Sequence, residues 1–352
     1  MADAKKVVVQ LPGQAKAPSI AERYELELEE LAPVGVELIE SETMDEDEFI
    51  ELAKDVDGIL TSWGVRLNKR VISELKQCVI IGVGSIGVDM VDVEAATEAG
   101  IVVTNTPDVF IEEVADHAMM LLLAQNKLLK TLMRFSQEGR WFEMRPVPSA
   151  IPRLWGQTLG LLGFGNVAVG VARRAKAFGL HIIAHDPYVS ELKMTGEGVE
   201  PVTFKELVER SDYLSIHAPD NPGTHHLIGA AELKAMKSTA VIINTARGPL
   251  IDEKALIKAL ENGEIAGAGL DVTEQEPPAK DNPLRNMENV VLTPHTASAS
   301  TRMRQETRRR AAREVALALS GRWPLSCVNP HVLPRSPLKR WQPYSMDRGP
   351  NR

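Results

Sequence analysis

Residues 158–168 read Thr-Leu-Gly-Leu-Leu-Gly-Phe-Gly-Asn-Val-Ala, and the fold can be argued outward from this stretch. An apolar run typical of a strand ends in Gly163-x-Gly165-x-x-Ala168, where a helical pattern begins. Gly163 permits a tight turn, Gly165 lets the backbone approach a pyrophosphate, and Ala168 is small enough for the helix to pack on the strand. This strand–turn–helix context predicts a dinucleotide-binding turn.

The residues on either side of the turn fit the same ligand. The N–H groups at the start of the helix, at Asn166 and Val167, carry a partial positive charge that suits a diphosphate. A second strand pattern at 181–185 ends in Asp186. Its carboxylate would accept hydrogen bonds from ribose hydroxyls and repel a 2′-phosphate, which favours NAD over NADP. The alternatives are a glycine turn without a ligand and a strand-end Asp before Pro187.

Short β-branched runs alternate with helical patterns along most of the chain. This alternation predicts an α/β fold, with parallel sheets covered by helices on both faces. Residues 111–138 differ, because their helical pattern has no breaker, and we expect one long helix that can bridge two domains. The strand-like runs are 7–11, 58–60, 79–81, 101–104, 159–162, 181–184, 213–216, 241–244 and 290–292.

Composition and charge narrow the function classes. The 352 residues carry a formal net charge of -8, which argues against nucleic acid as a partner. The only two cysteines, Cys78 and Cys327, give neither a disulfide framework nor metal-ligand spacing. The valines at 7–9 are too short a run for a signal peptide, and no apolar run is long enough to span a bilayer. We therefore expect a cytoplasmic protein with no membrane partner and no metal.

Residues 331–352 have a different composition from the rest of the chain. They contain four prolines, five basic residues and one Asp, with no helical or strand period. We expect a mobile, solvated tail. Basic segments of this kind also occur in proteins that bind nucleic acids or membranes, so that role is the alternative.

Arg247, Glu276 and His295 each follow a strand pattern, where parallel strands line a ligand crevice. Oxidising a 2-hydroxy acid removes a hydride from Cα and a proton from the hydroxyl. Histidine can exchange that proton near neutral pH, a carboxylate on its other nitrogen fixes the tautomer, and arginine can hold the substrate carboxylate. Singly, each could be a hydrogen-bonded or solvated loop residue. Together, behind a dinucleotide turn, they predict a hydride-transfer site.

On these residues the chain resembles the D-isomer-specific 2-hydroxyacid dehydrogenases, over about residues 5 to 330. The resemblance implies NAD-dependent hydride transfer between nicotinamide and a small D-2-hydroxy or 2-keto acid. It assigns catalysis to Arg247, Glu276 and His295. The motifs that carry it are Gly163–Ala168, Asp186, Asn244–Gly248, Asp271, Glu276–Pro277 and Pro294–His295.

The resemblance also implies how the cofactor is held. Asp271 would bind the nicotinamide carboxamide. Thr245 and Ala246, together with His217 and Pro219, would line the cofactor. No metal site is implied.

The family's architecture implies a Rossmann-type doubly wound parallel sheet domain at residues 108–299, inserted in a flavodoxin-like substrate domain. That second domain would combine residues 1–107 with residues 300–330, leaving 331–352 as the tail. Family members are usually dimers, so a homodimer is expected, with the helix after Pro107 near its interface.

The loop at residues 82–90 matches the family's substrate loop. The backbone N–H groups of Ile86 and Gly87 would face the substrate carboxylate. Three positions depart from the family's pattern: Ser85 stands where Gly is usual, Met90 where Asn is usual, and Val83 where several relatives carry Arg. The missing cation weakens the case for a phosphorylated or dicarboxylic substrate.

The resemblance leaves a second class of function open. Over its full length the chain is most similar to the branch that includes C-terminal-binding protein corepressors and their bacterial dehydrogenase relatives. An NAD(H)-sensing dimeric binding protein with little turnover is therefore the alternative, although residues 296–300 lack the tryptophan of those corepressors. Formate dehydrogenases of the same fold hold Gln where Glu276 stands, which argues against them.

Overall fold

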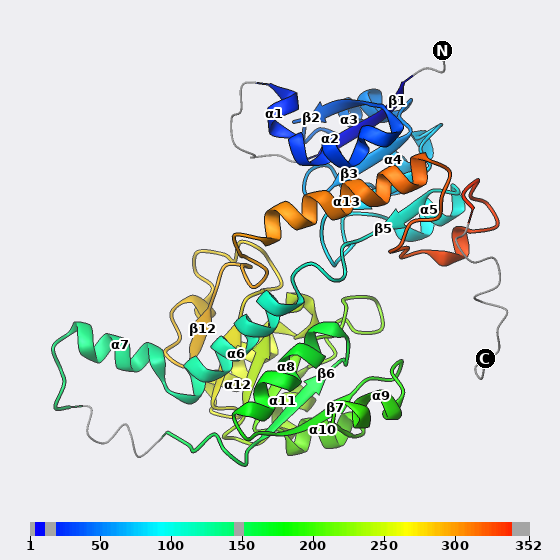
Figure 1. The fold of residues 1–352 in the computed structure, drawn as a ribbon. Helices are drawn as coiled ribbons and strands as arrows, with labels where there is room; N and C mark the ends of the chain where they lie inside the picture. The colour runs from blue at the N-terminus through cyan, green and yellow to red at the C-terminus, as the bar shows by residue number, and fades with distance from the viewer. Residues whose placement is uncertain (1–3, 11–18, 144–150, 340–352) are drawn as a thin grey trace. The chain divides into compact units, whose positions relative to one another are not determined.

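The chain forms two compact units in the computed structural model (Figure 1). Unit 1 combines Met1–Val109 with Ser300–Arg352, and unit 2 is Phe110–Ala299. Each unit has its own parallel sheet between helical layers. No helix within the described parts of the chain is both long and apolar enough to cross a lipid bilayer. The residues that the structure describes are 4–10, 19–143 and 151–339.

Unit 1 contains a five-stranded parallel sheet in the order β2-β1-β3-β4-β5, which is the flavodoxin-like order. Its β-branched strands bury both faces because successive side chains point to opposite sides. Val7 and Val9 pack into one core cluster of the unit, and Val8 packs into the other. The strands are β1 (Lys5–Gln10), β2 (Val36–Ser41), β3 (Gly58–Thr61), β4 (Ile80–Val83) and β5 (Val102–Thr104).

Helices cover both faces of this sheet. One core cluster contains residues of α2 and α13, and the other contains residues of α3, α4 and α5. The long α13 packs so closely on β4 that a Cβ on Gly82 would lie 2.7 Å from Cγ2 of Val315. The helices of unit 1 are α1 (Ile20–Arg23), α2 (Glu25–Leu31), α3 (Glu46–Ala53), α4 (Lys69–Glu74), α5 (Val93–Glu98) and α13 (Met303–Leu319).

Unit 2 contains a seven-stranded parallel sheet in the order β12-β11-β10-β9-β6-β7-β8. The order reverses between β6 and β9, as in doubly wound dinucleotide-binding sheets, and ligands bind at such a reversal. The predicted Rossmann-type and flavodoxin-like sheets are thus both present. The strands are β6 (Thr158–Leu162), β7 (His181–His185), β8 (Glu200–Pro201), β9 (Tyr213–Ile216), β10 (Val241–Asn244), β11 (Gly267–Leu270) and β12 (Val290–Leu292).

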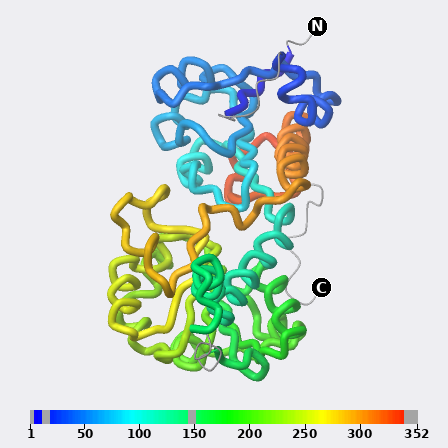
Figure 2. The backbone as a smooth tube through the Cα atoms, turned by 90° about the vertical axis from the view of Figure 1, so that its left-hand side faces the viewer, coloured from blue at the N-terminus to red at the C-terminus, as the bar shows by residue number. Residues whose placement is uncertain are grey.

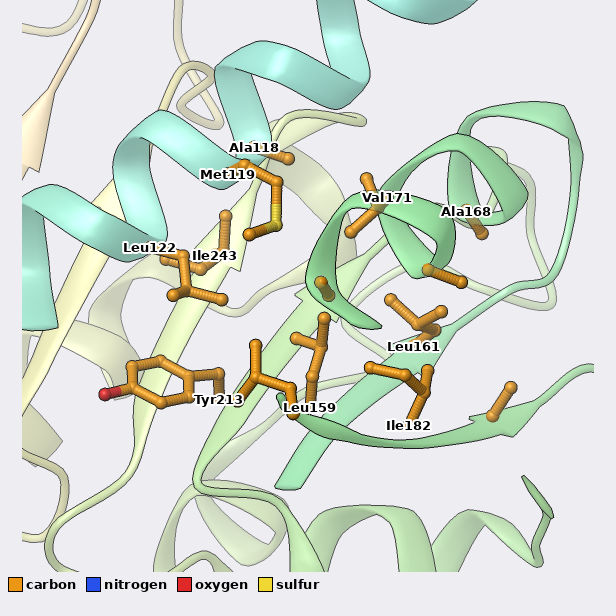
Figure 3. Close-up of a cluster of buried hydrophobic side chains, with 14 of the residues drawn as sticks. Ala118, Met119, Leu122, Leu159, Leu161, Ala168, Val171, Ile182, Tyr213 and Ile243 are labelled. Atoms are coloured by element: carbon orange, nitrogen blue, oxygen red, sulfur yellow. The ribbon is translucent and has the colours of Figure 1, made fainter. Parts of the chain in front are cut away.

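The core of unit 2 has two halves, one on each face of the sheet. On one face, α6 and α8 pack on β6, β7, β9 and β10, and Met119, Leu159, Val171 and Ile243 point toward one another (Figure 3). On the other face, apolar residues of α10, α11 and α12 are buried. The helices are α6 (Ile111–Asn126), α7 (Leu129–Gln137), α8 (Asn166–Ala177), α9 (Glu191–Gly196), α10 (Phe204–Arg210), α11 (Ala230–Ala235) and α12 (Glu253–Glu261).

The prediction of one unbroken helix over 111–138 is wrong. α6 ends at Asn126, and α7 begins after Leu128, which has a left-handed backbone with φ 53°. The last residues of α6 are anchored by their side chains, because Gln125 Nε2 donates to the carbonyl of Asn289 and Asn126 Nδ2 to the Tyr213 hydroxyl. The stretch contains no helix-breaking residue. The contacts that end α6 are made with residues far away in the sequence, so the local sequence could not predict where the helix ends.

The prediction of a mobile tail from residue 331 is also wrong for residues 331–339. Val332 and Leu338 are buried in the core cluster of unit 1 that includes α13, and Trp323 N–H donates to the carbonyl of Lys339. Figure 2 follows these last described residues, in red, beside α13 in orange. Val332 and Leu338 therefore pack on unit 1, although prolines lie close to them in the sequence. The rest of the predicted tail, 340–352, lies outside the described residues.

Candidate active site

The glycine turn between β6 and α8 has the geometry of a ligand cradle. Gly163 has φ +87°, and a Cβ there would lie 2.8 Å from the backbone nitrogen of Ala218. No atom lies within 4 Å of the Cβ position of Gly165, so the turn borders open space. α8 begins at Asn166, and its first N–H groups have no partner within the helix. The turn therefore leaves room for a diphosphate at a helix N-terminus.

Asp186 lies at the carboxyl end of β7, beside the turn. Its Oδ2 accepts a hydrogen bond from the backbone N–H of Phe164 at 2.8 Å, and its Oδ1 accepts one from Tyr188 at 2.8 Å. The carboxylate is half-buried, so oxygen lone pairs remain for a ligand. The structure thus brings Asp186 to the glycine turn.

Four further predicted cofactor residues follow the neighbouring strands β9 and β10. His217 Nε2 and Ser215 Oγ are 2.9 Å apart, and burial lowers the pKa of His217 to about 4, so this ring is neutral at pH 7. Thr245 is buried, and its hydroxyl has no hydrogen-bond partner within the described chain. Because buried polar atoms are normally paired, this orphan hydroxyl fits a missing ligand. Ala246 is half-buried and Pro219 is exposed.

His295 and Glu276 form a hydrogen-bonded pair beyond β12 and β11. His295 Nδ1 lies 2.6 Å from Glu276 Oε2, and Glu276 Oε1 accepts the N–H of Thr273 at 3.2 Å. A carboxylate on Nδ1 holds the proton there, which leaves Nε2 for a substrate. Both side chains are partly exposed, at 50% for His295 and 37% for Glu276, so a substrate can reach the ring.

The pair favours the charged forms of both residues. The hydrogen bond that His295 donates to Glu276 raises the pKa of His295, while burial and the charge of Arg247 partly oppose this shift. Burial alone would raise the pKa of Glu276, but its hydrogen bond to His295 and the charges of His295 and Arg247 lower it overall. His295 therefore keeps a proton to a higher pH than free histidine and can act as an acid near neutrality.

Arg247 is the third predicted catalytic residue, and it lies near the other two. Its guanidinium donates to the carbonyl of Ala246 at 2.7 Å and is half-buried. It is close enough for its charge to act on the pKa values of both Glu276 and His295. The structure therefore brings the three predicted catalytic residues together within unit 2.

We expect Glu276→Gln to move the pH profile of keto-acid reduction toward lower pH. With His295 as the predicted proton donor in reduction, kcat/KM falls as the pH rises through the pKa of His295. The carboxylate raises that pKa, and the neutral amide removes the charge that does so. The kcat/KM profiles of both proteins, measured from pH 5 to 10 with saturating NADH, check this. An unshifted profile in the variant would mean that Glu276 does not set the proton affinity of His295.

Asp271 holds the backbone turn that carries His295. Its side chain is 1% exposed, and its carboxylate accepts the N–H of Thr296 at 2.9 Å, the N–H of Ala297 at 2.8 Å and the Thr293 hydroxyl at 2.6 Å. The N–H of His295 in turn donates to the Asp271 carbonyl at 2.8 Å. We therefore describe Asp271 as a positioning residue. Its contact with a nicotinamide carboxamide stays a prediction.

His117 belongs to the same network and was not among the residues predicted from the sequence. Its Nε2 lies 2.9 Å from the Thr293 hydroxyl and 3.5 Å from Asp271 Oδ1. One signal was present in the sequence, namely a histidine inside the apolar pattern that became α6. The pattern alone does not indicate which distant strand that ring would reach.

The predicted substrate loop lies in unit 1, after β4. Ser85 Oγ donates to the carbonyl of Gly87 at 2.6 Å, and Asn105 Nδ2 donates to the carbonyl of Ile86 at 2.8 Å. Within the described chain, the N–H groups of Ile86 and Gly87 have no acceptor. Two successive N–H groups without an acceptor are available to an anionic oxygen. Ser85, which stands where Gly is usual, fixes the loop by its hydroxyl.

The structure shows no group of three or more His, Cys, Asp or Glu side chains that could hold a metal ion, among the residues it describes. The donors around His295 and Arg247 are instead those of proton exchange and carboxylate binding. The glycine turn, the orphan hydroxyl of Thr245 and the residues after β7 and β9 together fit a nicotinamide dinucleotide.

Several known proteins are similar to this chain. A family model described as D-isomer specific 2-hydroxyacid dehydrogenase, NAD binding domain, matches residues 119–297. The glyoxylate reductase of Korarchaeum cryptofilum is 40% identical over 320 residues, which are 89% of this chain and 92% of that protein. The D-3-phosphoglycerate dehydrogenase of Methanocaldococcus jannaschii is 38% identical over 91% of this chain, but the chain spans only 60% of its length.

A solved structure matches both units. The NADPH-dependent glyoxylate/hydroxypyruvate reductase of Sinorhizobium meliloti, in complex with NADP and malonate, superposes with a TM-score of 0.79 at 34% identity. The match covers 97% of this chain and all of that chain (100%). The fold and the site are those of the nicotinamide-dependent dehydrogenases. The chain belongs to the D-isomer-specific 2-hydroxyacid dehydrogenase family, whose members transfer a hydride between nicotinamide and 2-hydroxy or 2-keto acids, and this confirms the family predicted from the sequence.

Proposed function

We propose that this protein is an NAD-dependent D-2-hydroxyacid dehydrogenase that uses His295, Glu276 and Arg247. The observation that carries the proposal is the 2.6 Å bond between His295 and Glu276, with the charge of Arg247 acting on both. A proton donor and a carboxylate-binding cation at one place are what reduction of a 2-keto acid requires. A keto-acid panel with NADH, followed by absorbance, tests the proposal directly.

Each residue has a defined task in reduction. Arg247 holds the substrate carboxylate and polarises the carbonyl. The N–H groups of Ile86 and Gly87, in unit 1, stay the predicted donors to carboxylate oxygens. The reduced nicotinamide supplies the hydride when it is bound. His295 donates the proton from Nε2 to the carbonyl oxygen, and Glu276 stabilises the imidazolium before that transfer. In the oxidation direction the same nitrogen accepts the hydroxyl proton.

The cofactor residues support NAD rather than NADP as the preferred nucleotide. Asp186 places a carboxylate at the end of β7, where a 2′-phosphate would meet like charge. The Sinorhizobium meliloti reductase is NADPH-dependent, so the family includes proteins that use NADP as well as NAD. In this chain Asp186 is the residue that favours NAD. The proposal that the cofactor is a nicotinamide dinucleotide does not depend on Asp186.

We expect Asp186→Asn to narrow the preference for NADH over NADPH by roughly tenfold or more, because like-charge contacts cost several kcal/mol. The amide oxygen can keep one of the two backbone hydrogen bonds, which Phe164 and Tyr188 donate to different oxygens of Asp186, so the melting temperature of the variant is measured as well. Asp212→Asn is the control, since Asp212 binds the N–H of Thr158 at the opposite end of β6. The ratio of kcat/KM for the two cofactors is the measurement. An unchanged ratio in Asp186→Asn would show that another residue selects the nucleotide.

The alternative function, an NAD(H) sensor without turnover, would not need the catalytic set. A binding protein gains nothing from a histidine whose proton affinity is raised by a carboxylate. The intact set therefore supports the enzyme. NADH-dependent dimerisation without turnover on any 2-keto acid would favour the sensor instead.

We also propose that two copies of this chain associate through unit 2. Apolar side chains are exposed there on α6, α7 and the segment after α7, including Met120 at 43%, Met133 at 51%, Trp141 at 70% and Phe142 at 80%. A groove of about 550 Å³ lies between α6, α7 and α8. Monomers rarely expose contiguous apolar patches of this kind, and the family resemblance points to a second copy.

Light scattering after size exclusion is expected to give the mass of a dimer. Met133→Glu should shift the equilibrium toward monomers, because a charge would be buried against an apolar surface. Glu138→Lys, a charge change near the end of the same helix, serves as the control. A monomeric parent protein at micromolar concentration would contradict the dimer.

A further inference from the structure

Two glutamates of unit 2 link the two loops that carry Arg247 and Glu276. The loops are residues 245–252, the Arg247 loop, and residues 271–277, the Glu276 loop. Glu253 is the first residue of α12 and follows the Arg247 loop directly. Its backbone N–H donates to Oε1 of Glu274 at 3.0 Å, and the N–H of Glu274 donates to Oε2 of Glu253 at 3.0 Å. Each carboxylate thus accepts the backbone N–H of the other residue.

The two loops also touch through their backbones. A Cβ on Gly248 would overlap the carbonyl of Thr273, so the glycine lets the Arg247 loop lie directly on the Glu276 loop. Gly248 is the first residue of a short 3-10 helix that ends at Leu250, whose N–H donates to the Arg247 carbonyl. This short helix leads into α12. The backbone of Arg247 and Glu253 therefore belong to one short hydrogen-bonded segment.

On the other side of the contact, successive N–H groups of the Glu276 loop have different acceptors. The N–H of Thr273 donates to Oε1 of Glu276 at 3.2 Å. The next N–H, that of Glu274, donates to Glu253. The backbone that orients the Glu276 carboxylate is therefore anchored one residue further along the chain. Without this anchor, the carboxylate could move relative to His295.

His226 contacts both loops at once. Its Nε2 lies 2.6 Å from Oε1 of Glu274, and its backbone N–H donates to the carbonyl of Pro249 at 2.7 Å. Its left-handed backbone, with φ 51°, turns the chain at this point. The other glutamate is held as well, because Asn282 Nδ2 donates to Oε1 of Glu253 at 2.7 Å. Both glutamate side chains are therefore fixed by neighbours as well as by each other.

Helix capping alone does not account for this arrangement. The side chain of Asp252 already caps α12 by accepting the N–H of Ala255 at 3.0 Å. The hydrogen bond from the Glu274 N–H to Glu253 satisfies no group of the helix. His226 and Glu274 are about one-third exposed, at 37% and 32%, and ion pairs as exposed as this contribute little stability. The contact therefore fits a role in alignment better than a role in folding.

We propose that Glu253 and Glu274, together with His226, are positioning residues that hold the Glu276 loop at a fixed place against the Arg247 loop. The inference rests on the proposed function, because it says how two catalytic residues of that reaction are aligned. A displacement of about 1 Å in the site can cost roughly 10²-fold in rate. A fixed contact between the two loops therefore acts directly on turnover.

Alanine and glutamine at position 274 separate the effect of position from the effect of charge. Glu274→Ala removes the acceptor of the Glu253 N–H, and we expect kcat for 2-keto acid reduction to fall by roughly 10- to 100-fold. Glu274→Gln keeps an oxygen that can accept this N–H, so its kcat should stay within about threefold of the parent value. Equal losses in both variants would assign the effect to the charge of Glu274 and overturn the proposal.

The pKa of His295 provides a second measurement. Three charged groups act on it, namely Glu276, Arg247 and Asp271, and the hydrogen bond to Glu276 has the largest effect and raises the pKa. Glu274→Ala should loosen that bond, so the kcat/KM profile should move toward lower pH, by no more than in Glu276→Gln. In the double variant, the alanine should add no further shift toward lower pH, because the carboxylate through which it acts is already absent. Additive shifts would mean that Glu274 acts on His295 independently of Glu276.

Glu206→Ala is the matched control. The Glu206 carboxylate also accepts a backbone N–H at the start of a helix, that of Thr203 before α10, at 2.9 Å. Its kcat and pH profile should equal those of the parent. If Glu206→Ala lowered kcat as far as Glu274→Ala, a general loss of helix capping would explain both results and the proposal would fail. Should Glu274→Ala not fold, as judged by circular dichroism, Glu253→Ala breaks the same contact from the other side and carries the same expectations.

A measurement without turnover separates this inference from the proposed function. The NMR signal of the His295 ring C2–H, assigned by its absence in His295→Gln, gives the pKa of His295 directly. If the parent turns over no 2-keto acid, but Glu274→Ala lowers this pKa and Glu274→Gln does not, the proposed function fails and the positioning role stands. If the parent turns over 2-keto acids and Glu274→Ala changes neither kcat nor this pKa, the proposed function stands and the inference fails.

Discussion

His295→Gln is expected to lower kcat for 2-keto acid reduction by roughly 10³-fold or more, near the upper end of what a positioned acid contributes. The glutamine amide can donate the hydrogen bond to Glu276, so the loop keeps its conformation. An amide does not give up and regain a proton at neutral pH, so it cannot act as the acid. NADH should still bind with unchanged affinity, because the glycine turn and Asp186 are untouched.

Steady-state kinetics and NADH fluorescence titration measure the two effects separately. His181→Gln is the control, because His181 is exposed on β7 and pairs with Glu200 at 2.7 Å on the surface. It should retain parental turnover. Parental turnover in His295→Gln would mean that His295 is not the acid. A loss of NADH affinity would mean that the substitution had disturbed unit 2 beyond residue 295.

Arg247→Ala is expected to lower kcat/KM by roughly 10²- to 10³-fold, the cost of removing one donor that meets developing charge. Both the substrate carboxylate and the carbonyl lose their cation, so KM should rise while kcat falls. Arg247→Lys should recover little, because an ammonium cannot reproduce the planar fork of a guanidinium.

Arg173→Ala provides the comparison, since Arg173 is 66% exposed and pairs with Glu197. Melting temperatures of all three proteins show whether folding is retained. If Arg247→Ala changed neither KM nor kcat, the substrate carboxylate would have to be bound by other residues, and the Ile86–Gly87 loop would be the first to examine.

The sequence predicted the parts of the site that follow strands. In a parallel sheet, all carboxyl ends lie on one edge, so the positions of Gly163, Asp186, Arg247 and His295 could be inferred once each was placed after a strand. Spacing and residue type carried the remaining information. The short distance between His295 and Glu276 was predictable as a pairing, because a histidine acid needs a carboxylate to fix its tautomer.

Contacts between distant segments could not be predicted in this way. The turn that carries His295 is held by Asp271 and His117, and the latter comes from a helix far earlier in the chain. A cavity of unit 1 is lined by both Trp63 and Arg304, although more than two hundred residues separate them in the sequence. Local sequence patterns indicate secondary-structure propensity and burial. Contacts between distant residues depend on how whole layers of helices and strands pack, so those patterns do not predict them.

Deuterium transfer tests the central claim most directly. The protein would be incubated with 2-oxopentanoate and NADH that carries deuterium at both C4 positions, so that either face of the ring delivers the label, and the product analysed by NMR and chiral chromatography. The account predicts deuterium on C2 of a D-2-hydroxy acid, with the signal lost in His295→Gln. A product without deuterium at C2, or one of L configuration, would contradict it.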